Sequence, residues 1–476
     1  MLNHSIHFKS LLVLCLLYFL EPSPKLLAQN ISNNKYHATP NWVTSTDFVS
    51  QSRSTSLVID SFGNSYSTGY FSDKVWLEDS IYMERCGTVE LTSNNYFLSK
   101  RNKQGTLLWI RYGIGYTRTS KVLLDPLGNI CIIGQLWSNT LQLSSNKDSI
   151  IEKNKSSLHC NQSNIFICQY DSTGKVLRAK ILPSQKGQAP NDCMLDTQGN
   201  FLIGGYYNYR NPDAPRIVKF SYSFIKLNPS WDILWTREGK AIGGSQIRAI
   251  TLDTHSNIYV TGGFTKSITF GKESLKGHPY ETRGFIAQYH SDGTVQWVLD
   301  SIVSTPTSSV TDIACDQEQN IYALIHTQHS KTFLIKFNSN RQQIWSKTIE
   351  GRQTMNGLLI NDKNHIYLFG NGYTGNFGST KYADELLSYN DYSCYSFFIA
   401  QYNTYGNLLS LNIEGTKGLN YCQDIALFKN QILVLGTSNA GRKLRFGSYT
   451  KRVEWYFNIW LASFNQDDFA LKSQDE

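Results

Sequence analysis

A unit of four short strands recurs along this chain, and it constrains the fold more than any other feature. The clearest copy runs from Ile250 to Trp297, where the turn Asp253 to Asn257 joins two strands and Phe285 opens the next two. Apolar and polar residues alternate within each segment, and Asp, Asn and Gly supply the turns of antiparallel hairpins. The unit therefore predicts a small sheet of four antiparallel strands.

The opening turn of this unit occurs seven times, with a mean spacing of about 61 residues. Its Asp can accept hydrogen bonds from the loop amides, and its Gly or Asn accepts a positive φ, so we interpret these residues as structural. The sixth turn begins at Asn361, and a degenerate seventh begins at Phe428. The turn residues of the first five copies are Asp60, Gly63, Asn64, Asp125, Gly128, Asn129, Asp196, Gly199, Asn200, Asp253, Asn257, Asp316 and Asn320.

A third strand that starts with an aromatic residue also repeats, and a Trp marks the fourth strand of several copies. Sheets of this size must bury their faces against neighbouring copies, and a closed ring removes both exposed ends. Seven copies predict an all-β fold, a seven-bladed β-propeller. Basic residues two positions after the Trp, such as Arg111 and Arg237, either discourage pairing at the outer edges or are ordinary solvated charges. The fourth-strand Trp residues are Trp109, Trp235, Trp297 and Trp345, with Arg178 and Ser410 in their place in copies two and six.

The N-terminal segment is expected to close the ring. Trp42 precedes Asp60 by the interval that separates Trp235 from Asp253, whereas the chain after Trp460 reaches no equivalent Trp. Residues near Trp42 should therefore form the fourth strand of the last blade, paired with the strand that starts at Trp460. This assigns residues 40–468 to the propeller, 29–39 to a short N-terminal segment and 469–476 to a C-terminal tail.

Residues 1–28 have the pattern of a signal peptide, with Lys9, an apolar run from Leu11 to Leu20, and Ala28 at the cleavage site. The apolar run is too short to cross a bilayer as a helix, and no later segment is apolar for long enough. We therefore expect an exported chain, whether secreted, periplasmic or on the cell surface, that has no membrane span once the signal is removed.

Composition fits an all-β chain with many turns. Aromatic residues make up 13% of the chain and charged residues only 17%, and there are 34 glycines. The formal net charge of +8 is spread along the sequence and not clustered, so we expect no nucleic-acid partner and interpret the charge as favouring solubility. We expect a monomer.

The repeated pattern resembles a known family. Asp-x-x-Gly-Asn-Ile-Tyr-Val-Thr-Gly, followed by Phe-Ile-Ala-Gln-Tyr and a Gly-x-x-x-Trp strand, is similar to the SBBP (seven-bladed β-propeller) repeats of exported bacterial proteins. The resemblance covers nearly all of the mature chain and is clearest at residues 60–71 and 253–297, while copies five to seven drift. It implies a propeller and export, and it supplies no shared catalytic residues.

Strand parity indicates which face of the ring could bind a ligand. If the first-to-second and third-to-fourth turns are tight, they share one face, and the long second-to-third and fourth-to-first connections share the other. Variable loops on a rigid scaffold are where binding usually occurs. Tyr280 and Tyr373 lie in such connections and are candidate ligand contacts.

Three carboxylates are candidates for the mouth of the channel. Asp192, Asp312 and Asp424 each lie four residues before the turn landmark of copies three, five and seven, on strands expected to be innermost. They could cap or bond a neighbouring strand, hold a cation, or act as a general acid/base pair. We therefore expect a binding or scaffold protein for an unknown protein or glycan ligand. The alternative is a propeller-fold glycoside-active lyase or hydrolase. No catalytic residue, metal ligand or cofactor is predicted.

Cysteine placement yields one testable hypothesis. Cys86 and Cys160 lie late in the second-to-third connections of neighbouring copies, and export permits disulfides, so the two thiols could be joined. Alkylation of the unreduced protein should then leave both residues unmodified, and peptide mass spectrometry should recover them as one crosslinked fragment. Recovery of both as alkylated thiols would rule the bond out.

Overall fold

The computed structural model describes residues 38–469 apart from short stretches that lie mostly in long connections. The stretches left out are 49–51, 73–74, 78–80, 84–93, 145–148, 154–162, 185, 212–213, 240–241, 301, 306, 329–330, 352, 373, 378–379, 384–395, 415–418, 439–442, 447–448 and 453–457. Cys86, Cys160 and Tyr373 fall within them, so the disulfide hypothesis and one candidate tyrosine lie outside the described residues.

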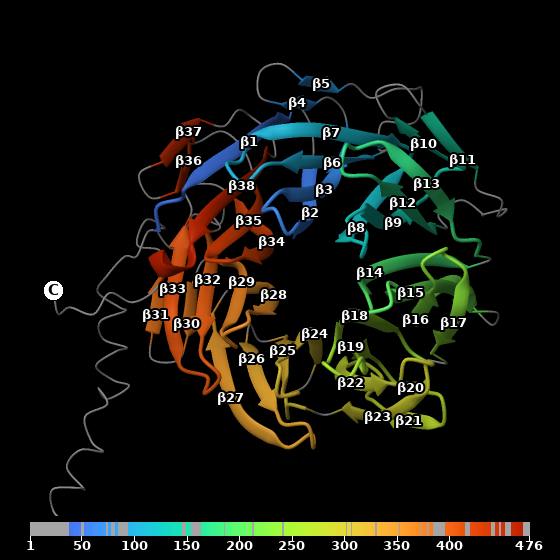
Figure 1. Cartoon of the computed structure of the whole chain (residues 1–476). Helices are drawn as coiled ribbons and strands as arrows, with labels where there is room; N and C mark the ends of the chain where they lie inside the picture. The colour runs from blue at the N-terminus through green and yellow to red at the C-terminus, as the bar shows by residue number, and fades with distance from the viewer. Residues whose placement is uncertain are drawn as a thin grey trace, which may run out of the picture.

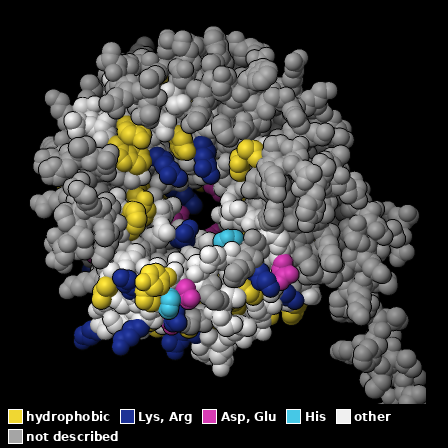
Figure 2. Space-filling model, turned by 180° about the vertical axis from the view of Figure 1, so that it is seen from behind, with side chains coloured by type: hydrophobic (Ala, Val, Ile, Leu, Met, Phe, Trp, Pro, Cys, Tyr) yellow, Lys and Arg dark blue, Asp and Glu magenta, His cyan; other side chains and the backbone are white. Residues whose placement is uncertain are grey.

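Seven antiparallel four-stranded sheets stand around a central channel, so the chain is a seven-bladed β-propeller, as predicted (Figure 1). Figure 2 shows the same channel from the opposite side. Within blades one to six the strands run outward from the channel in chain order, and in blade seven the outermost strand comes from the start of the chain. Blades one to three are β2 (Ser52–Ile59), β3 (Ser65–Phe71), β6 (Asn95–Arg101) and β7 (Leu107–Ile114); β8 (Thr117–Leu124), β9 (Ile130–Leu136), β12 (Asn164–Tyr170) and β13 (Val176–Ile181); β14 (Gly187–Leu195), β15 (Phe201–Asn211), β16 (Ala214–Leu227) and β17 (Ile233–Glu238).

The remaining blades follow the same plan. Blades four to six are β18 (Ser245–Leu252), β19 (Ile258–Phe264), β22 (Arg283–Tyr289) and β23 (Val295–Asp300); β24 (Ser308–Cys315), β25 (Ile321–Thr327), β26 (Lys331–Phe337) and β27 (Gln343–Glu350); β28 (Gln353–Ile360), β29 (Ile366–Gly372), β32 (Ser396–Tyr402) and β33 (Leu408–Glu414). Blade seven is β34 (Asn420–Phe428), β35 (Gln431–Ser438), β38 (Asn458–Asn465) and β1 (Trp42–Phe48). A short 3-10 helix, η1 (Gln466–Phe469), follows β38. No helix in the described part of the chain is long and apolar enough to cross a membrane.

Strand β1 closes the ring as the sequence predicted. It pairs antiparallel with β38, with Trp42 opposite Ser463 and Ser45 opposite Trp460. The last blade therefore joins the two ends of the propeller through a strand taken from the start of the chain (Figure 1).

Long second-to-third connections fold into additional hairpins. Those of blades one, two and six pair with the outermost strand of the preceding blade, as β4 with β1, β10 with β7 and β30 with β27. These pairings cover only the ends of β7 and β27, at Gly113 and Ile114 and at Ile349 and Glu350. Among the described residues no strand pairs with the outer edge of β7 at Arg111 or of β17 at Arg237, so the idea that basic residues discourage pairing there stays a prediction. The hairpins are β4 (Val75–Leu77) with β5 (Ile81–Met83), β10 (Thr140–Ser144) with β11 (Ser149–Lys153), β20 (Ser267–Phe270) with β21 (Glu273–Lys276), β30 (Thr374–Phe377) with β31 (Thr380–Ala383), and β36 (Lys443–Phe446) with β37 (Tyr449–Arg452).

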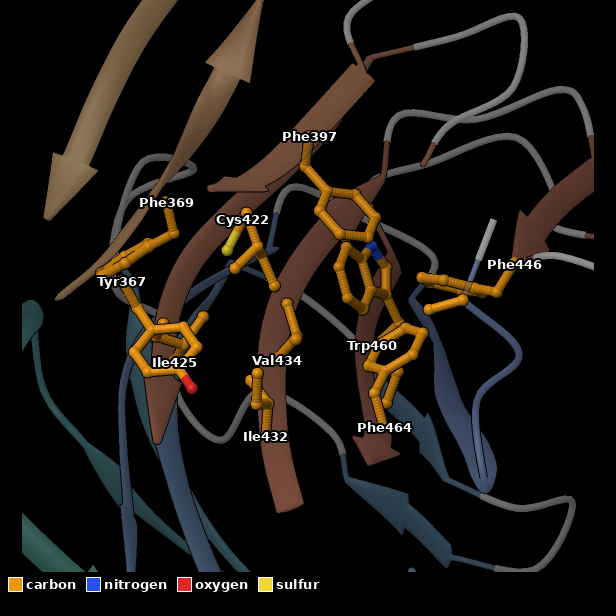
Figure 3. Packing of buried hydrophobic residues seen from close by; sticks show 13 residues of the cluster. Tyr367, Phe369, Phe397, Cys422, Ile425, Ile432, Val434, Phe446, Trp460 and Phe464 are labelled. Carbon is orange, nitrogen blue, oxygen red and sulfur yellow. The ribbon is translucent and has the colours of Figure 1, made fainter. Parts of the chain in front are cut away.

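The hydrophobic core lies between blades. Alternate residues of one strand point to opposite neighbours, so Ile432 and Val434 of β35 pack against blade six while Leu433 and Leu435 pack against blade one. Figure 3 shows the first of these layers, where Trp460 meets Phe397 of blade six. Each blade is therefore stabilised by both neighbours, which is the physical reason for closing the ring.

A recurring contact joins the outer strand of one blade to the turn of the next. The indole Nε1 of Trp42 donates to the Lys103 carbonyl at 3.0 Å, in the third-to-fourth turn of blade one. Gly105 ends that turn with φ of 87°, and a Cβ there would lie 2.6 Å from the Trp42 ring. The same arrangement holds at Trp109 with Ser172, Trp235 with Ser291 and Trp345 with Thr404.

Two other junctions pair an arginine with a tryptophan ring. In one the arginine lies on the outer strand and the ring in the turn of the next blade, and in the other the two are reversed. Arg178 of blade two lies 3.9 Å from the centroid of the Trp231 ring, which belongs to the turn of blade three, and donates to the Pro229 carbonyl at 2.7 Å. Trp297 of blade four instead faces Arg341 in the turn of blade five, at 5.5 Å. Arg111 and Arg237 also donate to turn carbonyls of the next blade, each at 2.7 Å, so their guanidinium groups are bonded between blades and are more than solvated charges.

The opening turns are built around their first residue. Asp60 Oδ1 accepts hydrogen bonds from the amides of Phe62 and Asn64, and its Oδ2 accepts from the Asn64 side chain and the Tyr66 hydroxyl. Asp253 is bonded in the same way, with Tyr259 in the place of Tyr66. The residues that take a positive φ in these turns are Gly63, Gly128, Gly199, Ser256, Gln319, Asn364 and Lys429.

Removal of the closing Trp tests the ring contact. Trp42→Ala should lower the free energy of unfolding by about 3 kcal/mol, because it opens a cavity at the junction of blades seven and one. Trp42→Phe keeps most of the packing and loses the indole hydrogen bond, so it should cost about 1 kcal/mol. Urea unfolding followed by fluorescence measures both.

Leu127→Ala is the matched control, since Leu127 is 87% exposed and its loss should change stability by less than about 0.5 kcal/mol. A Trp42→Ala variant as stable as this control would show that β1 does not close the ring in solution.

Candidate functional site in the axial channel

Every innermost strand carries a β-bulge at the same place. Its pairing with the second strand shifts register once in all seven blades. A bulge leaves one residue out of the ladder and turns its side chain away from the pleat. The bulged residues lie five positions before each turn landmark and are Thr55, Ser120, Asn191, Arg248, Thr311, Asn356 and Gln423.

The next residue on each of these strands forms a ring around the channel. Asp192, Asp312 and Asp424 occupy this ring in blades three, five and seven, and Lys121 occupies it in blade two. The blades that follow the three Asp residues carry small residues at this position, namely Ala249, Gly357 and Ser56.

Each Asp reaches into the blade that follows it. The Oδ2 atoms of Asp192, Asp312 and Asp424 accept hydrogen bonds from the amides of Ile250, Leu358 and Leu57, at 2.9, 2.7 and 2.8 Å. In blade six the space is especially tight, because a Cβ on Gly357 would lie 2.9 Å from Asp312 Oδ2. Of the roles that the sequence left open for these carboxylates, the geometry supports bonding to a neighbouring strand.

Lys121 is the counter-charge for this ring. Its Nζ lies 3.0 Å from Asp192 Oδ1, and the charge of Asp192 is the main cause that raises the pKa of Lys121 against the opposing effect of burial. Asp424 and Asp312 raise that pKa further, so the channel brings all four groups within electrostatic range. Among the described residues, no three His, Cys, Asp or Glu side chains are arranged to hold a metal ion.

Two of the carboxyl groups are hard to ionise. Burial raises the pKa of Asp312 to about 7, and the charge of Asp192 adds to the shift. Burial also raises the pKa of Asp424, although Lys121 opposes this. Both residues keep some contact with solvent, but the close channel walls exclude enough water to disfavour their charged forms.

A polar cavity of about 280 Å³ opens at the mouth of the channel. Figure 2 shows Lys and Arg side chains around this opening and carboxylates deeper inside. Five of the bulged residues line the cavity, together with Arg53 and Arg118 from the innermost strands of blades one and two. The remaining lining includes Tyr70, Gln135 and Tyr206 on the second strands of blades one to three.

Tyr280 is not part of this site. It follows the β20–β21 hairpin, which lies at the periphery of blade four in Figure 1, and its side chain is 90% exposed beside His278. The structure therefore separates Tyr280 from the three Asp residues that we grouped with it.

The cavity residues were missed in the sequence because their signal is local and weak. Arg53 and Arg118 both lie seven residues before a turn Asp, and this shared offset could have marked them. The bulged residues also share an offset and are all polar, but the bulge itself could not have been found in this way, because it depends on how the second strand pairs.

Comparisons with known proteins give limited likenesses. No family model matches the sequence. An uncharacterized WD repeat-containing protein of Acanthamoeba polyphaga mimivirus is 25% identical over 218 residues, which cover 37% of this chain and only 15% of that protein's own length. The fold assignment therefore rests on the strand pairing described above.

Solved structures similar in shape are also distant in sequence. Sqt1 from Chaetomium thermophilum has a TM-score of 0.46 and 7% identity, covering 90% of this chain and 98% of that chain. Virginiamycin B lyase from Staphylococcus aureus has a TM-score of 0.43 and 10% identity, covering 89% and 99%.

The raised pKa of Asp312 predicts a pH-dependent effect of its removal. The folded protein holds this proton up to about pH 7, whereas the unfolded chain releases it near 4, so the carboxyl destabilises the fold progressively as pH rises between these values. Asp312→Asn cannot ionise and should gain stability relative to the wild type across this window, by at most about 4 kcal/mol.

Urea unfolding midpoints at several pH values measure this difference. Asp362→Asn, at an exposed turn position, is the control, and its difference from the wild type should stay constant. A stability difference for Asp312→Asn that does not change between pH 4 and 7 would contradict the assignment.

Proposed function

We propose that this chain is a binding or scaffold protein that takes its ligand at the channel mouth, on the face of the long connections. The proposal rests on the observation that two sets of side chains in the channel have different roles. The carboxylates bond the blades together, whereas the cavity above them presents side chains from blades one, two, three, six and seven. A concave, preformed polar site of this kind suits ligand binding.

Export and the type of repeat belong to the same proposal. The N-terminal signal pattern and the resemblance to SBBP repeats support a protein that works outside the cytoplasm, and the proposal takes it to act as a monomer. Its ligand is then a protein or a glycan.

One observation favours a second candidate, a glycoside-active lyase or hydrolase. A carboxyl group whose pKa lies near 7, as at Asp312, has the proton affinity that general acid/base catalysis requires. However, Oδ1 of Asp312 accepts from the Ile313 amide and Oδ2 from the Leu358 amide. Both oxygens are therefore already bonded to backbone amides, Oδ1 within its own strand and Oδ2 in the next blade, which favours the binding protein.

Paired variants on the two faces test the proposal once a glycan and peptide screen of the purified chain has given a ligand. Replacement of the cavity residues, as Tyr70→Ala with Tyr206→Ala, should weaken binding at least tenfold, because both side chains line the mouth. Lys103→Glu with Lys175→Glu, both exposed in third-to-fourth turns, should leave the dissociation constant unchanged.

Calorimetric titration measures the dissociation constants, and unfolding midpoints confirm that each pair of variants is folded. Loss of binding in the turn-face pair with retention in the cavity pair would show that the working face is wrongly assigned. If the protein turns over a glycan, and Asp312→Asn abolishes that turnover but not glycan binding, the protein is an enzyme instead.

A further inference from the structure

Two guanidinium groups at the channel mouth have no partner within the described part of the protein. Arg53 on β2 and Arg118 on β8 are exposed, and none of the described side chains or carbonyls accepts a hydrogen bond from either. Arg111 and Arg237 differ, because their guanidinium groups are bonded to turn carbonyls of the next blade. The arginines at the mouth are thus available to a ligand.

Strand register directs both groups to one cavity. Arg53 pairs with Tyr70 in blade one, and Arg118 pairs with Gln135 in blade two. The equivalent pair in blade three contains Tyr206, and all of these residues line the same cavity of about 280 Å³. A ligand group in this cavity can therefore meet two guanidinium groups from adjacent blades.

Polar groups on the floor of the cavity are already engaged between blades. Asn191 Nδ2 donates to the Ile247 carbonyl at 2.7 Å, and Ser120 Oγ donates to the Pro190 carbonyl at 2.8 Å. Gln423 Oε1 accepts from Ser54 Oγ at 3.2 Å. Arg53 and Arg118 are the charged donors among the residues that line the mouth, and such donors suit a group that only accepts, such as a carboxylate.

The carboxylates deeper in the channel do not cancel this preference. They lie three residues further along their strands, about 10 Å deeper, which is about one Debye length at physiological ionic strength. Lys121 is paired with Asp192, and burial disfavours the charged forms of Asp312 and Asp424. The guanidinium groups thus dominate the charge at the mouth.

The innermost strand edges argue against an extended peptide as the occupant. A peptide strand would add to an edge through free backbone groups. Here side chains of the neighbouring blade already bond that edge, as Asp424 does at the Leu57 amide and Asn191 does at the Ile247 carbonyl. A compact ligand that presents a carboxylate beside hydroxyl groups fits the cavity better.

We propose that the cavity formed by Arg53, Arg118, Tyr70 and Tyr206 binds the carboxylate of an acidic sugar unit. This rests on the proposed function, since it names the ligand class for the same face. The two arginines bind the carboxylate, and the two tyrosines flank the sugar ring with an apolar face and a polar hydroxyl.

Calorimetric titration with glucuronate and galacturonate, against glucose and galactose, tests the ligand class. The acidic sugars should bind at least tenfold more tightly than the neutral ones, and high salt should weaken them. Arg53→Gln with Arg118→Gln should remove that preference, because charged hydrogen bonds are worth about tenfold or more each. Lys175→Gln on the opposite face removes a charge away from the cavity and should change nothing.

The outcomes separate this inference from the proposed function. Equal binding of acidic and neutral sugars, or an unchanged preference in the double Arg variant, would overturn the inference. If a triglutamate peptide binds and the uronates do not, the ligand is an acidic polypeptide, and the inference is also overturned. If a ligand no longer binds the Tyr70 and Tyr206 variant but still binds the double Arg variant, the proposed function holds and only the inferred anion site is rejected.

Discussion

The structure depends on contacts between blades more than on any contact within one. A four-stranded sheet exposes two apolar faces, and only its neighbours can bury them. In this chain the buried layers alternate along each strand, so Leu433 and Val434 belong to different interfaces although they are adjacent in sequence. Closure by β1 completes the last interface, and the channel carboxylates and outer Trp residues reinforce it at the inner and outer radius.

The fold could be predicted because its signals are local and repeated. The turn residues around Asp60 and Asp253 bond within a few positions of themselves, so their pattern reports their structure directly. The place of Trp42 followed from the same repetition, since counting from a turn landmark identifies the fourth strand wherever the chain supplies it. Periodicity therefore determined the number of blades and the way in which the ring closes.

The site could be predicted only in part, because its geometry depends on pairing between strands and blades. The offset from the turn landmarks identified Asp192, Asp312 and Asp424. It could not identify the backbone amides of the next blade that donate hydrogen bonds to them. The bulges were hidden because the first strands begin with polar runs, as in Ser52 to Ser56, which carry no apolar alternation that would reveal a register shift. The pairing of β10 with β7 and of β30 with β27 could not be predicted either, because each of these pairs joins two different blades.

The exchanged ring and cation at Arg178 and Trp231 have a consequence for how this chain can change. What is kept from one junction to the next is a pairing across two blades, and either side can supply the aromatic ring. A blade is therefore not an interchangeable module. Moving blade three next to Trp109 would set the Trp231 turn against another indole, where the native junction has a glycine. The sequence of each of these blades is therefore matched to that of its neighbour at the seam between them.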